Sequence, residues 1–156
     1  MKKWLLLAVV MALAVLQLSW PRFLVFFNAR PDLLLVFVVA AVFYLDFKIA
    51  LVFSIVCGLL KDAFLPADFG INTILFSLWC YAIWQLGRQI STEQTIVRFA
   101  VVFIAAFLNN IISGVQSANL GNFIPAGIFL RNLAVPSLYT AVLSPFIFKL
   151  TKNIAA

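Results

Sequence analysis

The chain has 156 residues, of which 65% are apolar and 10% are charged, and its formal net charge is +6. A soluble domain is about half apolar and about a quarter charged. Here the charges gather in short clusters between long apolar blocks, which is typical of a chain that crosses a membrane several times. The basic residues flank these blocks, where they contact lipid headgroups, so the charge does not indicate nucleic-acid binding.

The N-terminal block follows a Met-Lys-Lys start and resembles a signal peptide. No convincing small-residue cleavage site precedes Trp20, so we interpret residues 4–20 as an uncleaved first transmembrane helix that ends at Pro21. Pro31 and Asp32 are suited to the first turn of a helix, because proline needs no partner there and a carboxylate is stabilised by the helix dipole. They predict a second helix over residues 31–45.

The apolar pattern is interrupted at residues 44–48, although no Gly or Pro occurs there. A single helix over residues 33–60 would place Asp46 and Lys48 near the bilayer midplane, where each charge costs roughly 2.5–3.5 kcal/mol. A tight hairpin keeps both charges at the interface. We therefore expect a third helix over residues 47–60, although both helices are short for a membrane span.

Pro66 and Gly70 mark a turn before a fourth helix over residues 71–86, whose Trp and Tyr residues serve as interfacial anchors. A fifth helix is predicted over residues 96–112, and residues 113–121 form a polar connector. Residues 122–130 are apolar but short, which suggests a re-entrant or interfacial segment. The sixth helix is predicted to begin near Asn132 and to end before Lys149.

The predicted fold is all-α, a single integral membrane domain over residues 1–156 that forms a polytopic bundle with six transmembrane helices. An N-terminus in the cytoplasm then places most of the 11 Lys and Arg residues inside, as the positive-inside rule favours. Both termini are expected in the cytoplasm. Five helices with the N-terminus outside also satisfy the rule and stay open as an alternative.

Five polar residues fall at the outer ends of these helices: Asp32, Asp62, Asn109, Asn110 and Arg131. Ionisable groups at membrane depth usually face the bundle interior and pair with one another. We predict a polar cluster that binds a partner or stabilises the fold, with Arg131 paired to Asp62 or Asp32. The alternative is that these are ordinary helix-end residues in contact with water.

The sequence has no histidine and no recognisable catalytic motif, so we expect neither an enzyme nor a metal or cofactor site. The two cysteines, Cys57 and Cys80, lie inside apolar stretches and are interpreted as buried packing residues. Ala8 and Ala12 lie four residues apart on one face of the first helix, a spacing that permits close approach of a second helix in lipid. Gly58 and Gly70 are further candidates for helix packing.

Two motifs resemble the MreD family of bacterial rod shape-determining proteins. The first is Pro-Asp-Leu-Leu at residues 31–34, and the second is Gly-Leu-Leu-Lys-Asp at residues 58–62, followed by Gly70. In that family the first motif opens the second helix, the second ends the third helix, and an arginine follows the fourth helix, here Arg88. The resemblance in size and hydropathy covers the whole chain.

The resemblance implies a non-enzymatic inner-membrane scaffold of the cell-wall elongation machinery that maintains rod shape. The implied partners, besides membrane lipid, are the bitopic protein MreC, the actin-like MreB, RodA and a penicillin-binding transpeptidase. The family is similar in fold to the substrate-binding subunits of energy-coupling-factor transporters, which dock through Ala-x-x-x-Ala on helix 1, as Ala8 and Ala12 would. The alternative function is therefore a substrate-binding membrane subunit of a vitamin-type transporter.

Overall fold

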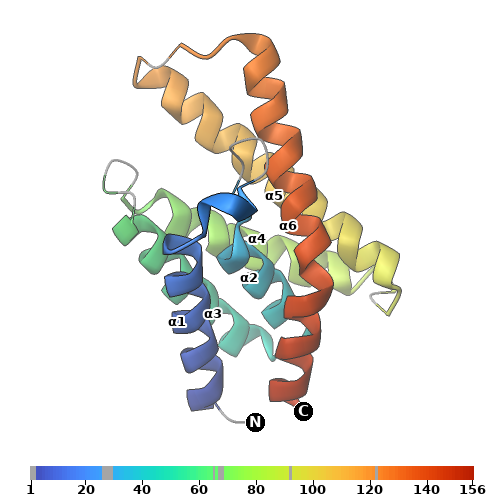
Figure 1. The fold of residues 1–156 in the computed structure, drawn as a ribbon. Helices are drawn as coiled ribbons and strands as arrows, with labels where there is room; N and C mark the ends of the chain where they lie inside the picture. The colour runs from blue at the N-terminus through green and yellow to red at the C-terminus, as the bar shows by residue number, and fades with distance from the viewer. Residues whose placement is uncertain (1–2, 26–29, 65, 67–68, 92, 122) are drawn as a thin grey trace.

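The computed structural model describes the whole chain except residues 1–2, 26–29, 65, 67–68, 92 and 122. The described residues form six α-helices and one short 3-10 helix, without a strand (Figure 1). The predicted all-α fold with six helices is therefore confirmed. The elements are α1 (Lys3–Leu18), η1 (Arg22–Leu24), α2 (Leu33–Tyr44), α3 (Phe47–Phe64), α4 (Ile71–Gly87), α5 (Thr95–Asn119) and α6 (Ala126–Ala155).

Helix α2 lies at the centre of the bundle. Every side chain from Leu33 to Ala41 is buried, and α2 contacts all five other α-helices. Its sequence, LLLVFVVAAVFY, is apolar around the whole helix circumference. A helix of this kind has no polar face to turn toward water, and it is stable when other elements surround it.

The predicted break between the second and third helices is confirmed. Leu45 has an extended backbone with φ −117° and ψ 161°, which ends the helical hydrogen bonding of α2. Asp46 and Lys48 lie on either side of Phe47, the first residue of α3, and both are exposed. The third helix is longer than expected and continues to Phe64, because Lys61 and Asp62 have partners on neighbouring helices.

The predicted connector over residues 113–121 and the predicted start of the sixth helix near Asn132 are wrong. Helix α5 continues through the polar residues to Asn119, where the Ser117 hydroxyl donates to the Ser113 carbonyl at 3.1 Å. Residues 126–130 form the beginning of α6, while Asn122 lies outside the described residues. Gly114 leaves room for the Phe129 ring, since a Cβ at residue 114 would lie 3.1 Å from Phe129 Cζ. This contact joins the two helices in the region predicted as a loop.

Helix α6 continues past its predicted end, through two prolines, to Ala155. Proline cannot donate a hydrogen bond to the carbonyl four residues earlier, so Pro145 leaves the Ala141 carbonyl without its usual donor. The Ser144 hydroxyl donates to that carbonyl at 2.6 Å. A serine directly before the proline therefore compensates for the lost bond and helps the helix to continue.

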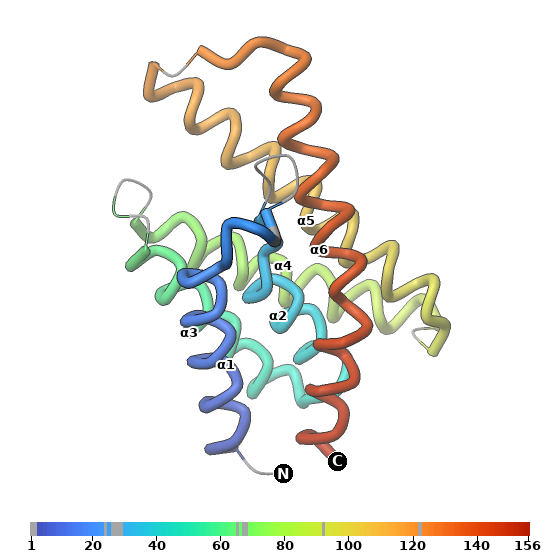
Figure 2. Tube along the Cα trace, viewed as in Figure 1, coloured from blue at the N-terminus to red at the C-terminus, as the bar shows by residue number. Residues whose placement is uncertain are grey.

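Helices α5 and α6 pack against each other, and the end of α5 and the beginning of α6 project beyond the other helices, away from the beginning of α1 and the end of α6 (Figure 2). Of the described helices, these two are long and apolar enough to cross a membrane. Helices α1, α2 and α4 are shorter, and α3 carries three charged residues. The six helices are thus established, whereas six membrane crossings stay a prediction.

Candidate functional site

The Asp62 carboxylate, in the last turns of α3, binds the first turn of α4. Its Oδ1 accepts hydrogen bonds from the backbone nitrogen and the Nδ2 of Asn72, at 3.0 and 2.9 Å. Its Oδ2 accepts from the backbone nitrogen and the Oγ1 of Thr73, at 3.0 and 2.5 Å. The first N–H groups of a helix have no partner within the helix, and this end of the helix dipole is positive. The buried Asp62 side chain therefore caps a neighbouring helix.

Gly58 lies one turn before Asp62 on the same face of α3 and allows α4 to approach closely. A Cβ at residue 58 would lie 2.9 Å from the Thr73 nitrogen and 3.0 Å from the Asn72 oxygen, and it would also collide with the Thr73 Cα. These are backbone atoms, which cannot rotate away as a side chain can. Gly58 and Asp62 together thus form a joint, the α3–α4 joint, with residues 72–73.

Gly70 has a different role from the helix packing predicted for it. It precedes the first residue of α4 with φ 93°, a left-handed conformation that side chains other than glycine rarely adopt. No described atom lies within 4 Å of the position that its Cβ would take. The backbone conformation, rather than close packing, accounts for a glycine at this turn.

Asp32 caps α2 and forms an ion pair with Lys61 of α3. The Asp32 Oδ1 accepts from the Leu35 nitrogen at 3.2 Å, while its Oδ2 binds the Lys61 Nζ. The Asp32 nitrogen donates to Thr140 Oγ1 of α6 at 3.1 Å, and the Leu34 nitrogen donates to Gln17 Oε1 of α1 at 3.3 Å. The start of α2 is therefore bound to three surrounding helices.

The ion pair predicted for Arg131 is not formed. Asp32 pairs with Lys61, Asp62 binds the start of α4, and the Arg131 side chain is exposed on α6. Lys61 is the partner that the sequence analysis missed. Its neighbour Asp62 lies about 100° further around the helix, so the two adjacent side chains reach different helices.

The two asparagines of α5 occupy different environments. Asn110 donates from Nδ2 to Ser137 Oγ at 3.2 Å and lines a cleft of about 310 Å³ together with Asp32 and Lys61. Asn109 is buried, and its Oδ1 has no hydrogen-bond partner among the described residues. The structure thus brings Asp32 and Asn110 together at one cleft, which Lys61 also lines, whereas Asp62 belongs to the α3–α4 joint.

We predict that Asp32→Ala destabilises the protein more than Lys61→Met does. The Asp32 variant loses the cap of α2 as well as the ion pair, at a cost of about 2–3 kcal/mol, whereas the lysine variant keeps the cap and loses the pair and the contact of Lys61 Nζ with the Phe76 ring. Both side chains are largely buried, with 15% of Asp32 and 12% of Lys61 exposed, so the pair is shielded from solvent. The free energy of unfolding in detergent gives the comparison, and equal losses would contradict the capping role of Asp32.

The described residues contain no cluster of three metal-ligating side chains. The carboxylates of Asp32 and Asp62 hold neighbouring helices together. Cys57 and Cys80 are buried free thiols inside the bundle, as predicted. The hydrogen bonds and the ion pair of Asp32 and Asp62 thus join neighbouring helices of the bundle.

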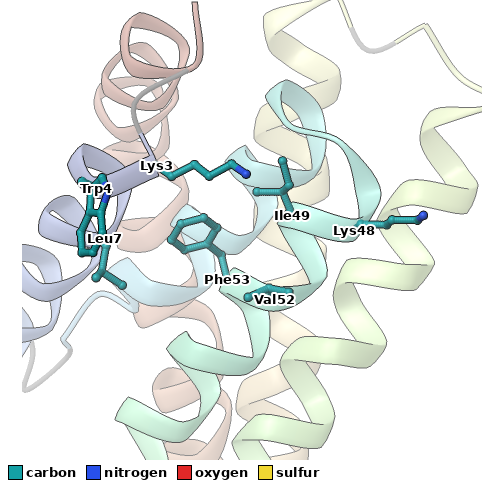
Figure 3. Close-up of a pocket in the computed structure, with 7 residues that line it drawn as sticks. All are labelled: Lys3, Trp4, Leu7, Lys48, Ile49, Val52 and Phe53. Atoms are coloured by element: carbon teal, nitrogen blue, oxygen red, sulfur yellow. The ribbon is translucent and has the colours of Figure 1, made fainter.

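The outward face of α1 is the second feature of interest. Ala8 and Ala12 are exposed there, whereas Leu6, Val10 and Leu13 on the opposite face are buried. An apolar groove of about 530 Å³ lies beside this face, between α1 and α3. In Figure 3, Trp4 and Leu7 of α1 border the groove opposite Ile49, Val52 and Phe53 of α3, and the Lys48 side chain points away from it.

The profile of the MreD family, described as rod shape-determining protein MreD, matches residues 1–154. No curated protein and no solved structure matches the chain, so the similarity to energy-coupling-factor transporter subunits is not shown. The motifs at residues 31–34 and 58–62 build the ion pair and the α3–α4 joint. The chain belongs to the MreD family, whose members are bacterial membrane proteins that act in rod-shape determination.

Proposed function

We propose that this chain is a non-enzymatic scaffold of the cell-wall elongation machinery in the bacterial inner membrane. In this proposal it binds the transmembrane helix of an MreC-type bitopic protein and links it to MreB, RodA and a penicillin-binding transpeptidase. Family membership supports the role in rod shape. The exposed Ala8 and Ala12 stripe on α1 is the observation that carries the docking proposal.

Small residues at helix interfaces in lipid allow two backbones to approach closely, which increases van der Waals contact. Ala8 and Ala12 are both exposed, so the described residues leave the stripe free for contact with a second helix. Leu5 and Met11 beside them are 46% and 48% exposed, so they offer apolar contact on both sides of the stripe. A second apolar helix fits this face.

The groove next to α1 extends the docking surface. Its walls are apolar except for the lysines at its edge, so it suits the side chains of a transmembrane helix. Trp4 is 85% exposed and stands at the rim, where a partner can cover it. Together, the stripe and the groove offer contact along the first half of α1.

We also propose that both termini lie in the cytoplasm. The beginning of α1 and the end of α6 are at the same end of the molecule (Figure 1), which supports a common side for both termini. Lys149 and Lys152 near the C-terminus add positive charge at that end, as expected for a cytoplasmic segment.

Enlarging the alanine stripe tests the docking proposal. We expect Ala8→Leu/Ala12→Leu to reduce co-purification of the MreC-type protein by about tenfold, since the larger side chains keep the partner backbone away. The same variant should fail to restore rod shape in cells depleted of the wild-type protein. Ala100→Leu, at an exposed alanine of α5, is the matched control and should bind and function normally. Normal capture of the partner by the double variant would exclude docking at this face.

The transporter alternative is not favoured. Its ligand site would need polar groups that are available to a small molecule. Here Asp32 and Lys61 bind each other, and Asp62 binds four donors of α4. These groups are satisfied by the protein itself, as expected when their role is structural.

A further inference from the structure

A basic pocket of about 250 Å³ lies between the beginning of α5 and the last third of α6. Arg98 comes from α5, while Lys149 and Lys152 come from α6 and lie three residues apart on one helix face. The residues that line this pocket include no Asp or Glu. The pocket is therefore suited to an anion rather than to a cation or a neutral molecule.

Arg98 is held in a defined position within the pocket. Its Nη1 donates to Tyr44 Oη at 2.6 Å, and its guanidinium lies over the rings of Tyr44 and Phe148, at 5.3 and 6.0 Å from their centroids. A guanidinium held in this way is already ordered, so it loses little further conformational entropy when it binds an oxyanion. Its planar donors suit phosphate oxygens in particular.

The surroundings of the pocket indicate that the anion belongs to a lipid. Phe99 and Pro145 form apolar parts of the lining. Ile96 lies about one turn before Phe99 on α5 and is 80% exposed, which extends the apolar surface beside the pocket. The two helices that form the pocket are also those long and apolar enough to cross a membrane. Basic pockets between such helices bind anionic lipid headgroups, and the acyl chains then extend along the apolar helix surface.

We propose that this pocket binds the headgroup phosphate of an anionic phospholipid such as phosphatidylglycerol. Arg98 contacts the phosphate oxygens as a bidentate donor, and Lys149 and Lys152 add charge from the other side. The site uses no residue of α1. Its occupation is thus independent of partner docking at the alanine stripe, and either proposal can fail without the other.

The test compares ligands on the purified full-length protein in a neutral detergent. Phosphatidylglycerol should raise the Tm of the wild-type protein, because a ligand that binds only the folded state stabilises it. Phosphatidylcholine and inorganic phosphate at the same concentration should raise it much less. In Arg98→Gln/Lys149→Gln/Lys152→Gln, the apparent affinity for phosphatidylglycerol should fall by about tenfold or more.

A charge-matched variant distinguishes binding in the pocket from nonspecific electrostatic attraction between an anionic lipid and a basic protein. Lys3→Gln/Lys48→Gln/Arg88→Gln removes the same charge outside the pocket and should keep the wild-type response. Lys149→Gln/Lys152→Gln changes only exposed side chains, so folding is not affected, and it should show a smaller loss in the same direction. An equal loss in the pocket and control variants would overturn the proposal. So would protection by inorganic phosphate equal to that by the lipid, or an unchanged lipid response in the pocket variants.

Discussion

Gly58→Ala should destabilise the protein by about 2–3 kcal/mol, because the added methyl group overfills the contact between α3 and α4. Alanine is the better helix former by about 1 kcal/mol, so intrinsic propensity alone predicts the opposite sign. The added Cβ would meet backbone atoms of Asn72 and Thr73. Helix α4 must then move away, which lengthens the four hydrogen bonds to Asp62.

Gly127→Ala is the matched control for this prediction. Gly127 lies in α6, and no described atom is within 4 Å of the position that its Cβ would take. We expect this variant to be as stable as the wild type or more stable by about 0.5–1 kcal/mol, as helix propensity predicts. The free energy of unfolding in detergent measures both variants. A Gly58 variant as stable as the Gly127 variant would contradict the close α3–α4 contact.

Asp62→Ala should cost about 3 kcal/mol, because it removes a charged acceptor and leaves the donors of Asn72 and Thr73 without their partner. Asp62→Asn keeps the size of the side chain and one acceptor oxygen, so its loss should be smaller. Glu93→Ala removes an exposed carboxylate and serves as the control, with a change within about 0.5 kcal/mol.

The two changes in the α3–α4 joint should not be additive. Gly58 and Asp62 act on the same first turn of α4, so displacing that turn already weakens the contacts made by the carboxylate. The Gly58→Ala/Asp62→Ala variant should therefore lose less stability than the sum of the single losses. Additive losses in this double-mutant cycle would show that the glycine and the carboxylate act independently.

The sequence indicates the helix boundaries most clearly where charge or backbone conformation decides them. The break at Asp46 follows from the cost of burying two charges, and it was predicted without a Gly or Pro to mark it. The start of α4 at Ile71 was likewise predicted from the glycine before it. In contrast, the extensions of α5 and α6 depend on local hydroxyl–carbonyl bonds and on the Gly114–Phe129 contact. The hydroxyl–carbonyl bonds lie within one helix and the Gly114–Phe129 contact joins two helices, and neither leaves a periodic signal in the sequence.

The membership of the polar cluster was partly predictable. Asp32, Asp62 and Asn110 could be identified as polar residues at helix ends or within apolar segments. Their partners could not, because pairing depends on the rotation of each helix and on which helices are neighbours. Arg131 and Lys61 carry the same charge, and only the packing of α3 against α2 selects Lys61. The central position of α2 does have a sequence signal, since its apolar residues surround the helix without a polar stripe.

The helices that form the outside of this protein differ greatly in length. At 1.5 Å per residue, the 16 residues of α1 span about 24 Å, whereas the 25 residues of α5 span about 37 Å. In the proposed arrangement of six membrane crossings, a lipid hydrocarbon layer of about 30 Å must thin beside α1, whereas the polar last turns of α5, residues 113–119, extend into the headgroup region. Such thinning would favour neighbours with short hydrophobic segments on the flank of α1 over neighbours with long ones.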